Sequence, residues 1–177
     1  MFTEPATKQH PAQPKKSPQS FRQEDLEVKI VNAKEEKISS TDEYDLVIVG
    51  SGIQIHRWTR QPEDFLKKYQ KQLATNKVTL FVCCGSATDK TKPEAAEQAR
   101  RKYLEEKVAK YNLRPVALGL FGGVYNYNKT PWYVKKAMEL DRLRVAAAFK
   151  ETEPGVYDTR DLNAIRLWAK ELAQTMQ

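Results

Sequence analysis

The side chains best suited to chemistry fall in two short stretches, each at the end of an apolar run. The first stretch, GSGIQIHRW, covers 50–58 and contains His56. This histidine can hydrogen-bond a ligand or protonate a substrate, although a lone histidine in a loop is more often solvated. The second stretch, VCCGS, covers 82–86 and contains Cys83 and Cys84. Either thiol is a candidate reactive group or, as is commoner for a buried cysteine, an inert part of the core.

Two further groups of residues are weaker candidates. A basic cluster before and within a predicted helix suits carboxylates or phosphates, but a solvated helix face is the simpler account. Glycines and tyrosines after a later apolar run can line a ligand crevice or form a plain turn. The basic cluster consists of Lys90, Lys92, Arg100, Arg101 and Lys102, and the other group of Gly122, Gly123, Tyr125 and Tyr127.

Composition and missing motifs narrow the function classes. The sequence contains no metal-ligand cluster, nucleophilic triad, Walker loop or dinucleotide fingerprint, which sets aside the classes that need them. A net charge of +7 favours an acidic partner, which could be nucleic acid, anionic lipid, an acidic protein or a polycarboxylate. Nucleic acid is not expected, because basic and aromatic residues form no ordered stripe.

The same composition predicts the compartment. No apolar run is long enough to span a membrane, so we expect no transmembrane segment and at most peripheral membrane contact. The two cysteines are adjacent, and neighbours in a strand point to opposite faces, so a disulfide between them is not expected. A reducing cytoplasm is the predicted setting.

Three continuous apolar runs position the candidate loops and predict buried strands. They are Tyr44–Val49, which we place centrally in the sheet, Val78–Cys84 and Val116–Phe121. Ahead of them, apolar and charged residues alternate over 26–30 (LEVKI), which predicts a half-buried strand. The order of the runs predicts four strands in all.

Helical patterns separate the runs. One helix is predicted to begin at Pro62, and 93–111 consists of helix formers throughout. A third helix is predicted from Trp132 to about Phe149, and Asp158 is the expected N-cap of the last one. Buried strands alternating with helices predict an α/β fold, a doubly wound parallel sheet covered on both faces.

The N-terminal segment differs in composition from the rest. Residues 1–23 contain four prolines among polar residues, so they can neither complete a sheet nor bury much surface. We therefore predict a disordered or aberrant segment over 1–23 and one domain over 24–177.

Four segments, taken in order and spacing, resemble the flavodoxin-like family and, more closely, its protoporphyrinogen oxidase branch. They are YDLVIVGSGIQIHRW at 44–58, VCCGS at 82–86, ALGLFGGVYNY at 117–127 and VYDTRDLNAIRLWAKELA at 156–173. The resemblance implies strand order 2-1-3-4-5 with FMN at the carboxyl ends of the strands. The cofactor-binding residues that it implies are Gly50, Ser51, Gly52, Ile53, Gln54, Ile55, His56, Trp58, Cys84, Gly85 and Ser86.

The resemblance also implies a function, namely FMN-dependent electron transfer or oxidoreduction. The expected partner is a redox protein or an anionic small molecule such as a porphyrin, and the basic charge of the chain favours the porphyrin. The alternative is a non-catalytic remnant or interaction module that keeps the fold without FMN. Flavin colour in the purified protein separates the two.

The chain departs from the family where the first strand and the phosphate-binding loop should lie. That strand occupies the centre of the family's sheet, and the turn after it wraps the FMN phosphate with hydroxyl and backbone donors. Residues 1–23 offer neither. We therefore expect the chain as written to hold FMN poorly and to fold poorly unless it borrows a strand.

A shifted reading frame would account for the missing segment. Read from the third base, the codons of residues 1–5 permit Val, then Tyr or His, then Gly, then Ala or Thr. In the same frame, residues 10–13 permit Ser-Gly-Thr and residues 13–21 permit Ala-Glu-Glu-Val-Ala-Ala-Val-Ile, a hydroxyl and glycine loop followed by an amphipathic helix. The alternative is an ordinary variable tail. Resequencing the gene around the codons for Met1 and for residues 23–25 decides between them, since the hypothesis requires a single-base slip at each place.

Overall fold

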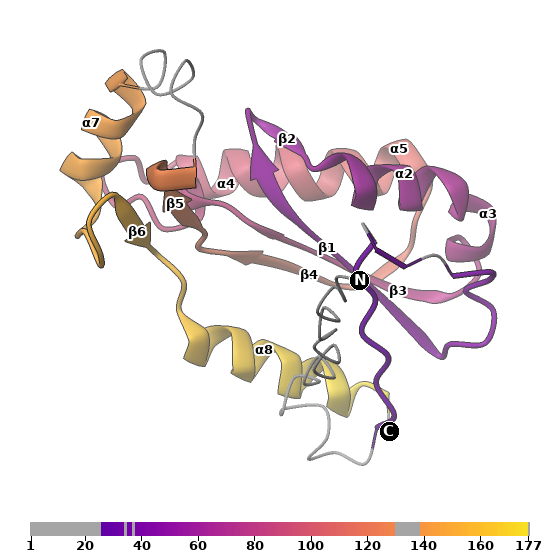
Figure 1. The fold of residues 1–177 in the computed structure, drawn as a ribbon. Helices are drawn as coiled ribbons and strands as arrows, with labels where there is room; N and C mark the ends of the chain where they lie inside the picture. The colour runs from indigo at the N-terminus through magenta and orange to yellow at the C-terminus, as the bar shows by residue number, and fades with distance from the viewer. Residues whose placement is uncertain (1–25, 34, 37, 130–138, 177) are drawn as a thin grey trace, which may run out of the picture.

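The computed structural model describes residues 26–33, 35–36, 38–129 and 139–176. Its main sheet has four strands in the order β2-β1-β3-β4 (Figure 1). The strands are β1 (Leu46–Gln54), β2 (Arg57–Trp58), β3 (Lys77–Cys83) and β4 (Pro115–Phe121). Neighbours among β1, β3 and β4 run parallel, and β2 pairs antiparallel with the end of β1. The predicted α/β fold with a parallel central sheet is confirmed.

The parallel strands form on the three continuous apolar runs, because a strand covered on both faces needs apolar residues at consecutive positions. In β3, Val78, Leu80 and Val82 are completely buried. Strand β1 is longer than predicted. Its end, Gly50–Gln54, was expected to be a loop, but Gly50–Gly52 continue the parallel ladder with β3 and Ile53 and Gln54 pair with β2.

One face of the sheet is covered by helices that follow β2 and β3 (Figure 1). These are α2 (Arg60–Lys68), α3 (Gln70–Leu73), α4 (Ala95–Arg100), a π-helical turn η2 (Arg101–Glu105) and α5 (Glu106–Tyr111). Leu66, Leu73 and Leu104 anchor them in the main core with no exposed surface. The helix predicted over 93–111 is thus confirmed, apart from the π turn in its middle.

The opposite face is covered by α8 (Leu162–Gln174) (Figure 1). Its buried residues pack with Leu46 and Ala117 of the sheet in a second core cluster. The expected cap was wrong by three residues. Asp161 caps the helix, accepting hydrogen bonds from the backbone N–H groups of Asn163 (2.9 Å) and Ala164 (3.0 Å), whereas Asp158 lies in a strand.

A small second sheet, which the sequence did not predict, lies beyond the end of β4. It pairs β5 (Val124–Asn126) antiparallel with β6 (Val156–Asp158). The short helices η1 (Gly85–Ala87) and η3 (Tyr127–Lys129) and the helix α7 (Glu139–Ala148) complete the described elements. The first part of the helix predicted from Trp132 to about Phe149 lies outside the described residues.

One expectation about the N-terminal side of the sheet was wrong for the described residues. Residues 26–30 form no strand. Strand β1 lies between β2 and β3 in the sheet order, as expected of an interior strand, but along Leu46–Gly52 it pairs only with β3 among the described strands. Residues 1–23 lie outside the described part of the chain.

Candidate functional site

The segments that follow β3 and β4 meet at the carboxyl edge of the sheet. The backbone N–H of Cys84, after β3, donates to the carbonyl of Phe121 at the end of β4 (2.9 Å). Gly123 packs so closely on Cys84 that a Cβ added to it would lie 3.3 Å from the Cys84 Cα. In doubly wound sheets this edge is where ligands bind.

The β1–β2 hairpin extends from the same edge and carries most of the predicted site. Its two turn residues, Ile55 and His56, have φ angles of 46° and 57°, as in a type I′ turn. A β-branched residue rarely adopts positive φ, and the Ile55 side chain is 91% exposed, so no packing offsets that strain. The hairpin tip is therefore both strained and apolar.

The Ser51 hydroxyl connects β1 with Thr59, the residue that follows β2. Ser51 Oγ donates to the carbonyl of Gly52 (2.8 Å), accepts from the backbone N–H of Thr59 (3.0 Å) and lies 3.1 Å from Thr59 Oγ1. Ser51 is 5% exposed. Its hydroxyl is therefore hydrogen-bonded within the protein, and these hydrogen bonds fix the position at which β2 ends and α2 begins.

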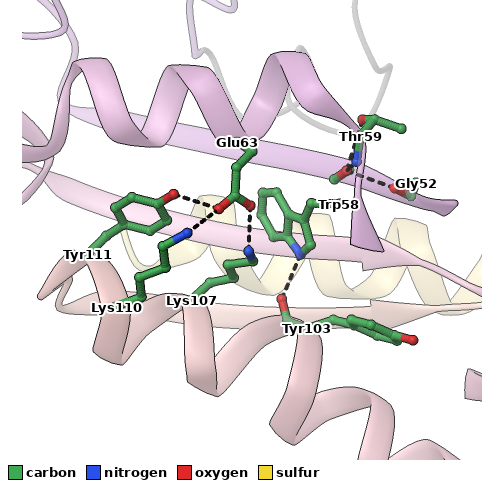
Figure 2. A network of polar contacts seen from close by, with 9 residues as sticks. Gly52, Trp58, Thr59, Glu63, Tyr103, Lys107, Lys110 and Tyr111 are labelled. Carbon is green, nitrogen blue, oxygen red and sulfur yellow. Dashed lines mark hydrogen bonds and ion pairs between the residues drawn. The ribbon is translucent and has the colours of Figure 1, made fainter. Parts of the chain in front are cut away.

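Trp58 anchors the hairpin to the helical layer (Figure 2). Its ring is buried, and Nε1 donates to the backbone carbonyl of Tyr103 at 2.7 Å. Tyr103 belongs to the π turn η2, where the helical hydrogen-bond ladder is interrupted. The indole thereby satisfies a buried carbonyl, and the sequence gives no signal of this pairing.

Beside Trp58, Glu63 forms ion pairs with two lysines and a hydrogen bond with a tyrosine (Figure 2). It accepts from Lys107 (2.5 Å), Lys110 (2.7 Å) and Tyr111 (2.6 Å). Burial opposes ionisation, but the hydrogen bonds from Lys107, Lys110 and Tyr111 outweigh it and lower the pKa of Glu63 from 4.5 to about 2.

The groove between the hairpin and α5 measures about 420 Å³ and is lined partly by basic side chains, including His56, Arg57 and Lys102. Glu63 offsets the charge of two lysines there. Of the predicted basic cluster, Lys102 lies on this groove, and Arg100 pairs with Glu105 at 3.4 Å.

The glycines of the predicted site differ in what surrounds them. An added Cβ at Gly50 would lie 2.0 Å from the Phe81 ring, and one at Gly85 would lie 1.9 Å from the Tyr125 hydroxyl, so protein side chains already occupy both spaces. A Cβ added at Gly52 would have no atom within 4 Å apart from the chain neighbours of this glycine. Gly52 is therefore the position where a ligand can approach the β1 backbone.

A comparison with known families finds one match. The family described as Flavodoxin domain matches residues 19–145. This chain belongs to the flavodoxin-domain family. No curated protein and no solved structure matches the chain. Among the described residues of this flavodoxin domain, no helix is long and apolar enough to cross a membrane, and no group of His, Cys, Asp or Glu could hold a metal.

Flavodoxin domains generally bind FMN, and the described residues suit only part of that molecule. The open backbone at Gly52 can receive the edge of a flat ring. The hydroxyls around the carboxyl edge have protein partners: Ser51 with Thr59, Thr88 with Gly85, and Thr159 with Gly123. Gly52 therefore leaves room for the edge of a flavin ring, and these three hydroxyls are already hydrogen-bonded within the protein rather than free to bind the phosphate.

The two cysteine thiols, which were candidate reactive groups from the sequence, are partly or fully buried from solvent. Cys84 is buried and Cys83 half-buried, and both are free. Burial raises the pKa of each thiol, so both stay protonated at neutral pH. Ser86 Oγ donates to Cys84 Sγ at 3.6 Å, which turns that serine toward the protein.

Tyr125, a weaker candidate from the sequence, closes the loop after β3. Its ring covers Gly85, and burial and the charge of Asp141 raise the pKa of its hydroxyl to about 12. Tyr127 donates to Asp141 at 3.1 Å and anchors the second sheet instead. The close approach of Gly122 to Thr159 explains the glycine pair by packing.

Proposed function

We propose that this domain serves FMN-dependent electron transfer or oxidoreduction, with the flavin ring beside Gly52 at the carboxyl end of β1. The observation that carries the proposal is the open backbone at Gly52 on the ligand-binding edge of a flavodoxin-family sheet. A bound flavin supplies the redox chemistry, and the protein supplies its position and surroundings. The ring would contact residues of 50–58 and 84–86, which were predicted for this role.

The phosphate of FMN requires donors beyond the described residues. Hydroxyl and backbone N–H groups at a helix N-terminus are the usual source. We propose that the segment encoded in the shifted frame supplies them. We call the chain in which this segment replaces residues 1–23 the frame-restored chain.

The protoporphyrinogen oxidase branch is the finer proposal. Residues 24–177, which the frame-restored chain keeps, have a net charge of +4, and this charge and the exposed Arg57 beside the hairpin suit an anionic substrate such as a porphyrin better than a basic redox protein. The test is oxidation of a porphyrinogen by the FMN-loaded frame-restored chain with an added electron acceptor. The rise in porphyrin fluorescence measures the reaction. No increase over free FMN would contradict this branch. A cytoplasmic setting remains part of the proposal.

A second candidate function is an interaction module of the same fold without FMN. The observation that favours it is the pairing of the hydroxyls around the carboxyl edge with protein groups.

Substitution of Gly52 distinguishes the two candidates. A Gly52→Val side chain would fill the open space, so the frame-restored chain should lose at least about tenfold in FMN affinity, equivalent to about 1.4 kcal/mol. Lys77→Val, at the exposed amino end of β3, is the control and should leave FMN affinity unchanged. Titration of flavin fluorescence measures both. Equal affinities for the two variants would place the ring elsewhere, and no binding by the unsubstituted frame-restored chain would favour the interaction module.

A further inference from the structure

The groove between the β1–β2 hairpin and α5 has the size of a small-molecule site and a surplus of positive charge. Its volume of about 420 Å³ lies within the range of about 300–1,000 Å³ that is typical of ligand pockets. The open backbone at Gly52 is not part of its lining. Five basic and three acidic residues line it, and with His56 neutral they leave a net charge of +2. The basic residues are Arg57, Arg60, Lys102, Lys107 and Lys110, and the acidic residues are Glu63, Asp64 and Glu106.

On the side of α5, the groove already binds a carboxylate of the protein itself. Glu63 accepts from Lys107 at 2.5 Å and from Lys110 at 2.7 Å (Figure 2). The side chains of Glu63 and Lys107 are only 24% and 19% exposed, so this pair is partly shielded from water. One carboxylate faces two ammonium groups here, which leaves one positive charge in excess. Arg60, by contrast, is balanced by Asp64 at 3.2 Å.

The other two cations of the groove, Arg57 and Lys102, have no carboxylate partner among the described residues. Arg57 is exposed, and the Lys102 ammonium lies 5.6 Å from the centre of the Tyr103 ring. The two cations directly precede Trp58 and Tyr103, and the 2.7 Å hydrogen bond between Trp58 and Tyr103 joins β2 to the π turn. Glu106 forms no ion pair with either cation. The fold therefore brings two uncompensated cations together on neighbouring backbone segments.

We propose that this groove binds a small molecule carrying a phosphate or carboxylate group, with the anionic oxygens between Arg57 and Lys102. A guanidinium presents two parallel N–H donors that match such a group, and an ammonium adds a point charge. The excess charge beside Glu63 attracts the same ligand. All the residues that form the site lie within 56–110, so the proposal does not depend on FMN binding.

Pyrophosphate and citrate are the probes for the two kinds of anionic group. Each is titrated into the isotope-labelled, flavin-free chain as written at constant ionic strength. The amide NMR signals of Arg57, Trp58 and Lys102 should shift with a Kd of about 1 mM or lower for at least one probe. The probe that binds more tightly identifies the ligand as a phosphate or a carboxylate. The frame-restored chain should behave alike, because it contains the same groove, and no shift at these residues in either chain would overturn the proposal.

A matched pair of substitutions separates a defined site from the general attraction of anions to a basic protein. Lys102→Gln should weaken binding of the tighter probe at least about threefold, because it removes a cation from the site. Arg101→Gln is the control, since Arg101 is the neighbouring exposed cation of the π turn and does not line the groove. Its affinity should be nearly unchanged. Equal losses in the two variants would overturn the proposal by showing diffuse attraction only.

Glu106→Gln should change the affinity in the opposite direction. Removing this carboxylate from the groove should strengthen binding about twofold, a gain that impaired folding would not produce. Glu97→Gln is the control, because Glu97 is exposed on α4 and does not line the groove. Unchanged or weaker binding by the Glu106→Gln variant would contradict a ligand held by the positive charge of the groove.

Discussion

At the residue scale, the two turn residues of the β1–β2 hairpin have a strained backbone conformation. A type I′ turn is best served by Asn-Gly, and this chain has Ile55 and His56 at the two positive-φ positions. The strain is not repaid by packing, since Ile55 is almost fully exposed. Retained strain of this kind is typical of positions that contact a ligand or partner.

Replacing the turn residues should therefore stabilise the protein. The double substitution Ile55→Asn and His56→Gly should raise the free energy of unfolding by about 1–2 kcal/mol, because it relieves two strained positions. Urea unfolding measures the change. Ile55→Val is the control, since it keeps a β-branched residue at positive φ and should give no gain. A loss of stability in the double variant would contradict the turn described.

Glu63 is the residue whose charge matters most to stability. Its folded pKa, about 2, lies below the unfolded value of 4.5. A depressed folded pKa stabilises the protein above the unfolded pKa, and that stabilisation is lost as the pH falls from about 4.5 to about 2.

Glu63→Gln should consequently cost about 1–2 kcal/mol at pH 7, a figure reduced for partial solvent screening. The difference from the unsubstituted chain should shrink as the pH falls from 4.5 to 2, as measured by urea unfolding across that range. Asp64→Asn is the control, because the Asp64–Arg60 pair is largely exposed and should contribute little. A Glu63→Gln effect independent of pH would contradict the assigned charge network.

At the element scale, the contact between the hairpin and the π turn is the least foreseeable feature. Residues 93–111 consist of strong helix formers, and nothing in that pattern marks where the ladder changes to π pairing. The position becomes understandable only with Trp58 in place, since its indole satisfies the Tyr103 carbonyl. Local propensity cannot report a partner 45 residues away in sequence.

Trp58→Phe tests this contact. It keeps an aromatic ring but leaves the buried carbonyl of Tyr103 without its donor, which should cost about 1–3 kcal/mol. Hydrogen exchange should also accelerate across Arg101–Glu105. Trp168→Phe is the control, because Trp168 contributes ring contacts with Phe81 and Phe121 and should cost less. Equal costs would show that the hydrogen bond to the π turn is not the source of stability.

The strands show which sequence patterns predict an element and which do not. The three parallel strands were predictable because each needs a continuous apolar run. The continuation of β1 was not, because Gly50 and Gly52 weaken a strand signal and the turn at Ile55 lacks turn chemistry. Strands β5 and β6, of three residues each, are too short to show periodicity.

The sequence pointed to a candidate site, but it could not show how the residues of that site pack. The resemblance to the flavodoxin-like family, whose FMN lies at the carboxyl ends of the strands, pointed to 50–58 and 84–86. It could not show that Phe81 fills the space at Gly50 or that Ser51 is bonded to Thr59, because these contacts depend on tertiary packing. The cofactor role of each predicted residue stays a prediction.

At the scale of the whole molecule, we propose one explanation for the edge of β1 that no described strand covers and for the phosphate donors that the described residues do not supply. Both lie where a first strand and its loop would stand in a flavodoxin domain. The described residues supply three parallel strands and the helices on both faces. One segment of about two dozen residues would complete the sheet and the binding site together.

The measurement that tests this account most directly is the visible absorption spectrum of the chain as written and of the frame-restored chain, each mixed with FMN and desalted. We expect only the frame-restored chain to retain the yellow flavin, close to one per protein. Retention by the chain as written would contradict the account, because the phosphate would then be bound without the first strand and its loop. Retention by neither chain would contradict the FMN function and favour the interaction module.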